Sequence, residues 1–222
     1  MSTLSRIPIN PQLRQGRRML TNAQVMHAAV LSCFPPDIST DTARVLWRID
    51  QGENAFTLYI TGPEAPDLRV IVEQAGWSTR PGQTTDYRPF LDRITAGQEW
   101  RFRLSANPVK SIPGAAGSRG RVVPHVTRAH QAEWLTQRSG KHGFEILRHP
   151  EENAEAMIAV TRTEDLRFER AGATRPVSIR RAQFDGGLRV TDAELLRRAL
   201  QQGIGRSRAY GCGLLTLAPF TQ

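Results

Sequence analysis

The order of strand and helix signals in the first half of the chain most constrains the fold. In chain order, we expect a strand at 4–10, a helix from an N-cap at Thr21 or Asn22 to Phe34, a hairpin of strands at 44–50 and 55–62, a short helix between Pro66 and Gly76, and a strand at 98–110. In the last segment Trp100, Phe102 and Leu104 alternate with polar side chains, which predicts a half-buried strand. This β-α-β-β-α-β order is that of a ferredoxin-like domain.

The second half shows a less regular version of the same order. We expect a helix at 127–139, strands at 143–148, 157–170 and 177–190, a helix opened by the capping box Thr191-Asp192-Ala193-Glu194, and a closing strand in LLTLA at 214–218. The Gly-, Pro- and Ser-rich residues 111–120 favour a loop. We therefore predict an α+β protein of two tandem ferredoxin-like (RRM-like) domains, 1–111 and 127–222, joined by a flexible loop or linker at 112–126.

The charge of the chain points to a polyanionic partner. Its 222 residues carry 30 Lys and Arg against 21 Asp and Glu, a net charge of +9, and only Lys110 and Lys141 are lysines. Arginine grips phosphate in two places and can stack on bases. No apolar run approaches the ~20 residues of a membrane-spanning helix, and no secretory signal opens the chain, so we expect a cytoplasmic protein. Two cysteines, Cys33 and Cys212, make neither a disulfide framework nor a zinc cluster.

A glycine-rich stretch, GIGRSRAYGCGLLTLAP at 203–219, precedes the end of the chain. Each glycine inside a helix would cost ~0.5–1 kcal/mol relative to alanine, so the stretch favours an ordered turn. Exposed amides beside Arg206 and Arg208 would form a cradle for phosphate. The alternative is a connector from helix to strand with a glycine C-cap. Neither the dinucleotide fingerprint nor the P-loop pattern is present.

This glycine-rich stretch resembles the C-terminal signature of the repeat-RNA endoribonuclease of type I-E CRISPR systems, the CasE subunit of Cascade. Four further segments agree with this family, in order along the whole chain: NAQVMHAAVLSCF (22–34), VLWRID (45–50), RFRLSANPVKS (101–111) and VSIRRAQFDGGLRVTD (177–192). The resemblance implies a protein that binds the hairpin of a CRISPR repeat transcript, cleaves it once at its 3′ base, and stays bound within the complex.

The chemistry that this resemblance implies needs no metal and no other cofactor. The 2′-hydroxyl of RNA attacks the adjacent phosphate and leaves a 2′,3′-cyclic phosphate and a 5′-hydroxyl. The protein then has to assist two proton movements and stabilise charge on phosphorus. The chain has five histidines but no carboxylates beside them at metal-ligand spacing, which disfavours a metal-dependent nuclease.

His27 is our candidate catalytic residue. On a helical wheel Met26, Ala29, Val30 and Cys33 form an apolar stripe, and His27 lies about 100° from Met26, at the border of that stripe. Packing can orient an imidazole there while solvent still reaches it. Its ordinary pKa, near ~6.5, suits proton transfer at neutral pH. The alternative is a partly buried structural histidine.

The residues expected to assist His27 depart from the family pattern. Some relatives have a tyrosine three residues before the histidine, where this chain has Gln24, and relatives often have lysine where this chain has Arg208. An amide can hydrogen-bond a phosphate but does not exchange a proton at physiological pH. Tyr210 and Arg208 are therefore candidates for catalytic support beside Gln24.

The remaining basic residues are candidates for RNA binding. A hairpin that includes 157–170 could lay a cationic edge against A-form RNA, which is recognised mainly by shape and phosphate contacts. For any single arginine, a solvated surface position is the alternative. The full set of predicted RNA-binding residues is Gly203, Gly205, Gly211, Arg206, Arg208, Arg162, Arg167, Arg170, Arg175, Arg180, Arg181, Arg119, Arg121 and Lys110.

Two other functional classes stay open at this stage. Gln24 in place of tyrosine would also fit a non-catalytic subunit that only binds an RNA hairpin. A small-molecule enzyme is the third alternative, and it would leave the cationic segments of the second half unexplained. Cleavage of a repeat hairpin in the presence of EDTA separates the first two classes.

Overall fold

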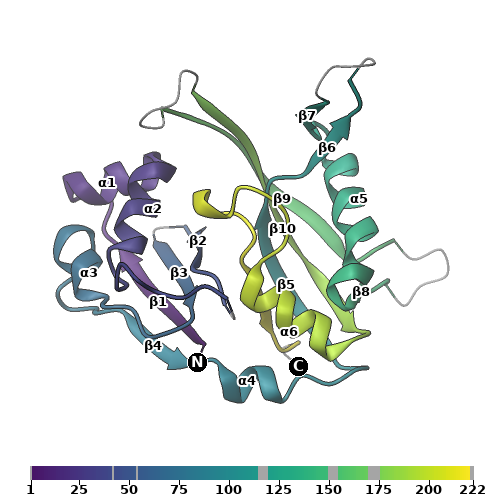
Figure 1. The fold of residues 1–222 in the computed structure, drawn as a ribbon, viewed down its shortest axis with the longest axis horizontal. Helices are drawn as coiled ribbons and strands as arrows, with labels where there is room; N and C mark the ends of the chain where they lie inside the picture. The colour runs from purple at the N-terminus through teal and green to yellow at the C-terminus, as the bar shows by residue number, and fades with distance from the viewer. Residues whose placement is uncertain are drawn as a thin grey trace.

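The computed structural model describes residues 2–41, 43–53, 55–114, 120–149, 155–169 and 176–220. Two antiparallel sheets lie side by side, one formed by the first part of the chain and one by the second (Figure 1). No helix in these residues is both long and apolar enough to cross a membrane.

The first sheet has the strand order β2-β3-β1-β4, and all its pairs are antiparallel. Its elements are β1 (Thr3–Ile9), α1 (Arg14–Thr21), α2 (Ala23–Leu31), β2 (Leu46–Gln51), β3 (Phe56–Gly62), α3 (Arg69–Ala75) and β4 (Gln83–Asp86). With α1 and α2 in the place of one helix, this is the β-α-β-β-α-β order of a ferredoxin-like domain.

The second sheet repeats this order. Its path is β11-β5-β10-β8, and β9 also pairs with β10, so the outer strand consists of two pieces. Its elements are β5 (Glu99–Ala106), α5 (Arg128–Ser139), β8 (Phe144–Ile146), β9 (Ile158–Phe168), β10 (Val177–Val190), α6 (Ala193–Gln202) and β11 (Leu215–Ala218), with short 3₁₀ turns η1 (Gly140–His142) and η2 (Arg208–Tyr210). The prediction of two tandem ferredoxin-like domains is confirmed.

The strand predicted at 98–110 forms, but its assignment to the first half is wrong. This segment forms β5, which pairs with β10 and β11 in the second sheet. The alternation of Phe102 and Leu104 with polar residues identifies a strand but not its partner, and both side chains are buried in the core of the second half. The first sheet closes instead with β4, whose residues QTTD are exposed and carry no apolar alternation.

The division of the chain therefore differs from the predicted boundaries. The two sheets separate between β4 and β5, and α4 (Arg88–Asp92) lies between them. The predicted linker at 112–126 overlaps a small hairpin of β6 (Val109–Ile112) and β7 (Arg121–Pro124). Residues 115–119, at the centre of that predicted linker, lie outside the described residues.

Two helix boundaries depend on caps. Asn22 is the N-cap of α2 and its side chain accepts hydrogen bonds from two backbone N–H groups, as the sequence predicted, but the helix ends at Leu31 and not at Phe34. The helix α1, which precedes this cap, was not expected from the sequence. The N-cap of α6 is Asp192, which accepts from the Leu195 N–H, so the expected capping box at Thr191 is wrong by one residue.

The two halves are packed tightly together. The buried core around β1 and α2 also includes Phe168, Ile179 and Cys212 of the second half. Arg48 on β2 is only 2% exposed, and it donates hydrogen bonds to the Asp50 carboxylate and to the backbone carbonyls of Arg103 and Leu214, at 2.9 and 3.2 Å. The groups contributed by the second half therefore have fixed positions against α2.

Candidate active site

The glycine-rich stretch after α6 is an ordered turn, as the sequence predicted. Gly203, Gly205, Gly211 and Gly213 all have positive φ, between 74° and 94°, a conformation that glycine adopts at little cost. The base of the turn is closed by the Ile204 N–H, which donates to the Gly213 carbonyl at 3.0 Å. We call residues 203–213 the glycine loop.

The glycine loop lies directly on the first half of the chain. A Cβ at Gly211 would lie 2.6 Å from Cζ3 of Trp47 and 2.8 Å from Nη1 of Arg181. Any side chain at this position would push the loop away from β2. The absence of a side chain therefore lets η2 pack against both α2 and β2.

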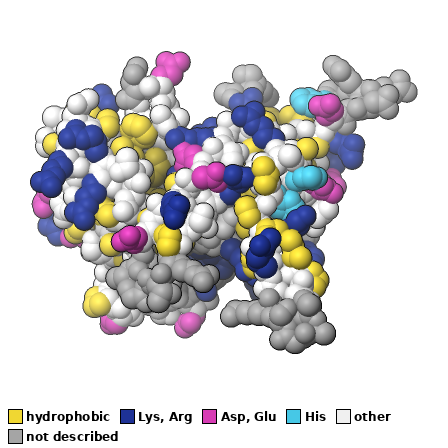
Figure 2. Space-filling model, turned by 90° about the horizontal axis from the view of Figure 1, so that it is seen from above, with side chains coloured by type: hydrophobic (Ala, Val, Ile, Leu, Met, Phe, Trp, Pro, Cys, Tyr) yellow, Lys and Arg dark blue, Asp and Glu magenta, His cyan; other side chains and the backbone are white. Residues whose placement is uncertain are grey.

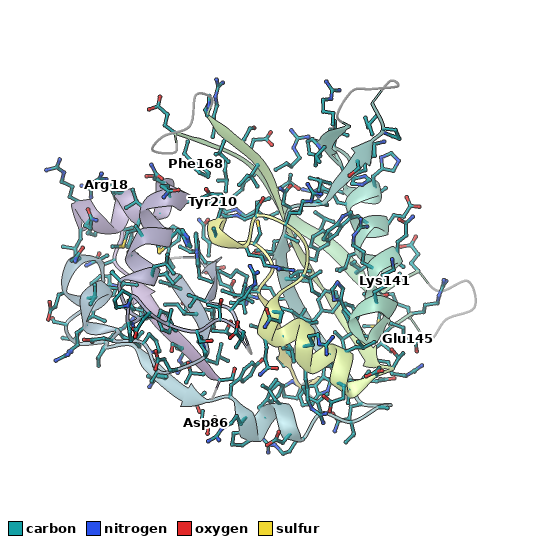
Figure 3. All side chains as sticks on the ribbon, viewed as in Figure 1. Arg18, Asp86, Lys141, Glu145, Phe168 and Tyr210 are labelled. Carbon is teal, nitrogen blue, oxygen red and sulfur yellow. The ribbon has the colours of Figure 1, made fainter. Side chains whose placement is uncertain are left out.

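His27 and Tyr210 lie together at this contact. Their ring centroids are 6.2 Å apart in an edge-to-face arrangement. The Tyr210 ring also packs on Phe168 at 4.7 Å (Figure 3). Phe168 was not among the residues expected at the site, and its apolar character near the end of a predicted strand was its one signal in the sequence.

The environment of His27 favours the neutral imidazole. His27 is half-buried at the border of the apolar stripe, as predicted, while Met26 and Val30 are fully buried. Burial lowers the pKa of the His27 imidazole from its ordinary 6.5. Its Nδ1 is buried and has no hydrogen-bond partner among the described residues, so Nε2 is the nitrogen available to a substrate.

Gln24 precedes His27 by about one turn of α2. Residues three apart share a helix face, and Gln24 is partly exposed. Its backbone N–H donates to the Asn22 side chain at 2.9 Å, within the helix cap. The structure thus places an amide, and not a phenol, on this side of the imidazole.

The two arginines of the glycine loop differ in direction. Arg206 is exposed, whereas Arg208 is folded back so that its Nη2 donates to the Gly203 carbonyl at 3.1 Å. Burial, and then the charge of Arg44, lower the pKa of the Arg208 guanidinium. The Nε of Arg208 is buried without a partner among the described residues. Arg206 is therefore the loop cation that solvent reaches most freely.

Most of the described arginines on the β9–β10 hairpin are already paired with acids. Arg180 binds Asp165 and Arg181 binds Glu164, each at 2.6 Å, and each pair lies directly opposite in the antiparallel register. Arg162 also binds Glu164. Acidic side chains are likewise set among basic ones near the middle of the face in Figure 2. This partial neutralisation was not expected from the sequence, because it depends on strand register.

The other predicted RNA-binding residues fall into two groups. Arg167 on β9, Lys110 on β6 and Arg121 on β7 are exposed, and Arg167 makes no ion pair with any residue that the structure describes. Three predicted residues lie outside the described residues, namely Arg119, Arg170 and Arg175.

A pair of histidines lies near the start of α5. The ring centroids of His125 and His130 are 6.1 Å apart. Burial, and then the charges of Lys110 and His130, lower the pKa of His125. Within the described ranges, no three His, Cys, Asp or Glu side chains form a group that could hold a metal ion.

A family model for CRISPR-associated proteins matches residues 4–219. The chain belongs to this family. Among curated proteins, the CRISPR-associated endoribonuclease Cse3 of Thermus thermophilus is 30% identical to this chain over 220 residues, which cover 97% of this chain and 99% of that protein. The Cascade subunit CasE of Escherichia coli is 31% identical over 134 residues, 57% of this chain and 61% of that protein.

The fold of the family is also that of this chain. A structure of Thermus thermophilus Cse3 bound to an RNA representing a pre-cleavage complex has a TM-score of 0.79 and 28% identity, and the match covers 98% of this chain and 99% of that one. The Cas6e protein of Escherichia coli, at 22% identity and a TM-score of 0.58, shares the fold. The family resemblance expected from the glycine-rich stretch and its four companion segments is confirmed.

Proposed function

We propose that this chain is an endoribonuclease that binds the stem-loop of a CRISPR repeat transcript and cuts it once, at the 3′ base of the stem. Relatives named as a CRISPR-associated endoribonuclease and as a Cascade subunit support this activity, as does the relative solved with a pre-cleavage RNA. The observation in this chain that carries the proposal is the half-buried His27 imidazole beside Tyr210 and the glycine loop. The cut RNA stays bound as part of a cytoplasmic Cascade complex.

The reaction uses a nucleophile that the RNA itself supplies. Neutral His27 accepts the proton of the 2′-hydroxyl through Nε2, and the 2′-oxygen forms a bond to the adjacent phosphorus. The bond from phosphorus to the 5′-oxygen breaks, and that oxygen takes a proton from solvent water to become the 5′-hydroxyl. The products are a 2′,3′-cyclic phosphate and a 5′-hydroxyl, and no metal-bound water takes part.

The residues around His27 have supporting roles in this proposal. Tyr210 directs its hydroxyl to the reacting phosphate, because its ring is held between His27 and Phe168. Gln24 donates an amide hydrogen bond to the same phosphate. Exposed Arg206 attracts the negative charge that develops on the phosphate oxygens. Arg208 can join it only after leaving the Gly203 carbonyl.

RNA binding depends on the exposed cations of the second half. Arg167, Lys110 and Arg121 are exposed on β9, β6 and β7, and we assign them to phosphates of the stem. The paired arginines Arg180 and Arg181 contribute less, because Asp165 and Glu164 already offset their charge.

A binding-only subunit is the second candidate function. The observations that favour it are Gln24, which cannot exchange a proton, and the inward direction of Arg208. The two candidates separate when a repeat hairpin is incubated with the protein in EDTA and the product ends are analysed. Cleavage that leaves a 2′,3′-cyclic phosphate, and that is abolished by a 2′-deoxy substitution at the cut site, supports the nuclease. Tight binding without a cut supports the binding-only subunit.

A further inference from the structure

The side chain of Asn107 connects the end of β5 to the glycine loop. Its Nδ2 donates a hydrogen bond to the hydroxyl oxygen of Ser207 at 2.9 Å. Asn107 is only 8% exposed. A buried asparagine directly after β5 thus holds Ser207, which lies 100 residues further along the chain.

Ser207 has an unfavourable backbone conformation. Its φ is 61°, and within the described ranges it is the one residue other than glycine with a positive φ. Residues with a Cβ adopt this conformation at a cost and keep it only where their surroundings hold them. Glycine would meet the backbone requirement more easily, as it does at Gly205 and Gly211. The hydroxyl that Asn107 binds is what serine adds at this position.

Ser207 in turn sets the direction of η2. It is the N-cap of this turn, and its carbonyl accepts the Tyr210 N–H at 2.9 Å. The Tyr210 ring then meets His27. A continuous series of contacts therefore runs from Asn107 through Ser207 and Tyr210 to the imidazole.

The base of the glycine loop has separate support. The Gly213 N–H donates to the Ser105 carbonyl at 2.6 Å, and the Ile204 N–H donates to the Gly213 carbonyl. These contacts do not involve Asn107. Loss of the Asn107 amide would therefore release η2 while the two ends of the loop stay anchored.

The unpaired oxygen of Asn107 argues for a specific use of this side chain. Its Oδ1 is buried and has no partner in the part of the chain that the structure describes. Burial of an unpaired acceptor costs free energy that an apolar side chain would avoid. An asparagine with an unpaired oxygen is worth its cost at this buried position if the hydrogen bond from its Nδ2 to Ser207 is required.

We infer that Asn107 is a positioning residue that keeps Ser207 in its left-handed conformation and thereby holds Tyr210 against His27. This inference rests on the proposed endoribonuclease activity. Asn107 itself contacts neither the imidazole nor, in this role, the RNA. Its effect falls on the rate of cleavage and not on the affinity for RNA.

Single-turnover cleavage of a repeat hairpin tests the inference with variants at both ends of the hydrogen bond. We expect Asn107→Ala to slow cleavage at least about tenfold, because small misplacement of catalytic groups is costly. Ser207→Ala should slow it as much, and the double variant should be no slower than either single one, since both remove the same contact. Affinity for a hairpin with a 2′-deoxy cut site should stay within about twofold.

Glycine at position 207 separates positioning from direct participation. In the Asn107→Ala background, Ser207→Gly removes the backbone strain, so the rate should return most of the way to that of the wild type. If Asn107 acted on the RNA directly, glycine at 207 would restore nothing. Failure of this rescue, or an Asn107→Ala variant that cleaves at the wild-type rate, overturns the inference.

Asn10→Ala is the matched control. Asn10 is a comparably buried asparagine, 9% exposed, whose Oδ1 accepts the Gln12 N–H at 2.9 Å on the first half. Its loss should reduce stability without slowing RNA cleavage.

A readout without RNA is trypsin cleavage of the protein after the exposed Arg206, which should be faster in Asn107→Ala than in Asn10→Ala. If the wild type binds RNA but does not cut it, the proposed function fails. In that case the trypsin experiment still tests the inference: equal trypsin cleavage of Asn107→Ala and Asn10→Ala would overturn the role of the Asn107–Ser207 hydrogen bond.

Discussion

The rings of His27 and Tyr210 meet edge to face, with centroids 6.2 Å apart and planes at 64°, although one residue lies on α2 and the other on η2 near the end of the chain. Each half of the protein thus supplies one ring. The Arg48 hydrogen bonds between the halves and the packing of Phe168 on Tyr210 keep this arrangement in place. We expect cleavage to depend on the contact between the two halves.

Replacement of His27 should remove the general base and little else. We expect His27→Ala to slow single-turnover cleavage at least ~10²-fold, the lower range for one acid–base group, while hairpin affinity stays near that of the wild type. His149→Ala is a suitable control, because His149 is exposed and lies outside α2. A parallel loss of affinity and rate would make His27 a binding or folding residue instead.

The rate of cleavage should fall on the acid side of neutrality. Burial lowers the pKa of His27 from 6.5, so the imidazole is neutral and able to accept a proton at neutral pH. The rate should therefore stay level as the pH drops to 6.5 and decrease as the pH falls through the lowered pKa, where the imidazole becomes protonated. Single-turnover rates over this range check the prediction. A rate that rises as the pH falls would assign His27 to the acid and not to the base.

Two glycines with similar backbone angles should respond differently to alanine. Gly97 (φ 88°) has open space where a Cβ would lie, whereas at Gly211 (φ 74°) a Cβ would meet Trp47 at 2.6 Å. Gly97→Ala should cost about 1–2 kcal/mol of unfolding free energy from its backbone alone. Gly211→Ala should cost about 1–3 kcal/mol more from overpacking, and it should also slow cleavage, because Tyr210 moves with the loop. Urea unfolding and cleavage rates give both readouts; equal effects of the two substitutions would contradict this account.

An exposed arginine that has no ion pair among the described residues should contribute more to the salt dependence of RNA binding than one that is already paired. Arg167→Ala should weaken hairpin affinity and reduce the slope of log Kd against log salt concentration by on the order of one unit, the loss of one phosphate contact. Arg198, which is exposed on α6, provides the control, and its alanine variant should leave the slope unchanged. Titrations of a labelled hairpin at several salt concentrations measure both. Identical slopes for the wild type and Arg167→Ala would remove Arg167 from the RNA interface.

Local patterns predicted many of the elements well. The strand at 177–190 has the predicted bounds, and Asn22 caps α2. The positive φ angles at Gly203 and Gly211 confirm the ordered turn. These features depend on neighbouring residues, through side-chain alternation, the capping side chain and the absence of a Cβ, so a single sequence contains the information.

Partners across the fold were harder to predict. The alternation in 98–110 is the same whichever sheet receives the strand, and β4 carries no apolar signal because its side chains are exposed. The same limit applies to the charges: Arg180 and Arg181 are cationic in the sequence, yet the strand register places Asp165 and Glu164 opposite them. Such pairings follow from long-range packing and not from local preference.

The amino-acid sequence by itself determined most of the individual strands and helices, the place of His27 at the border of an apolar stripe, and the need for positive φ in the glycine loop, because each follows from residues close together in the chain. Only the tertiary structure decided that β5 belongs to the second sheet, that Tyr210 meets His27, and that Asn107 holds Ser207. These contacts join distant segments, and they form because the cores of both halves must be buried at the same time.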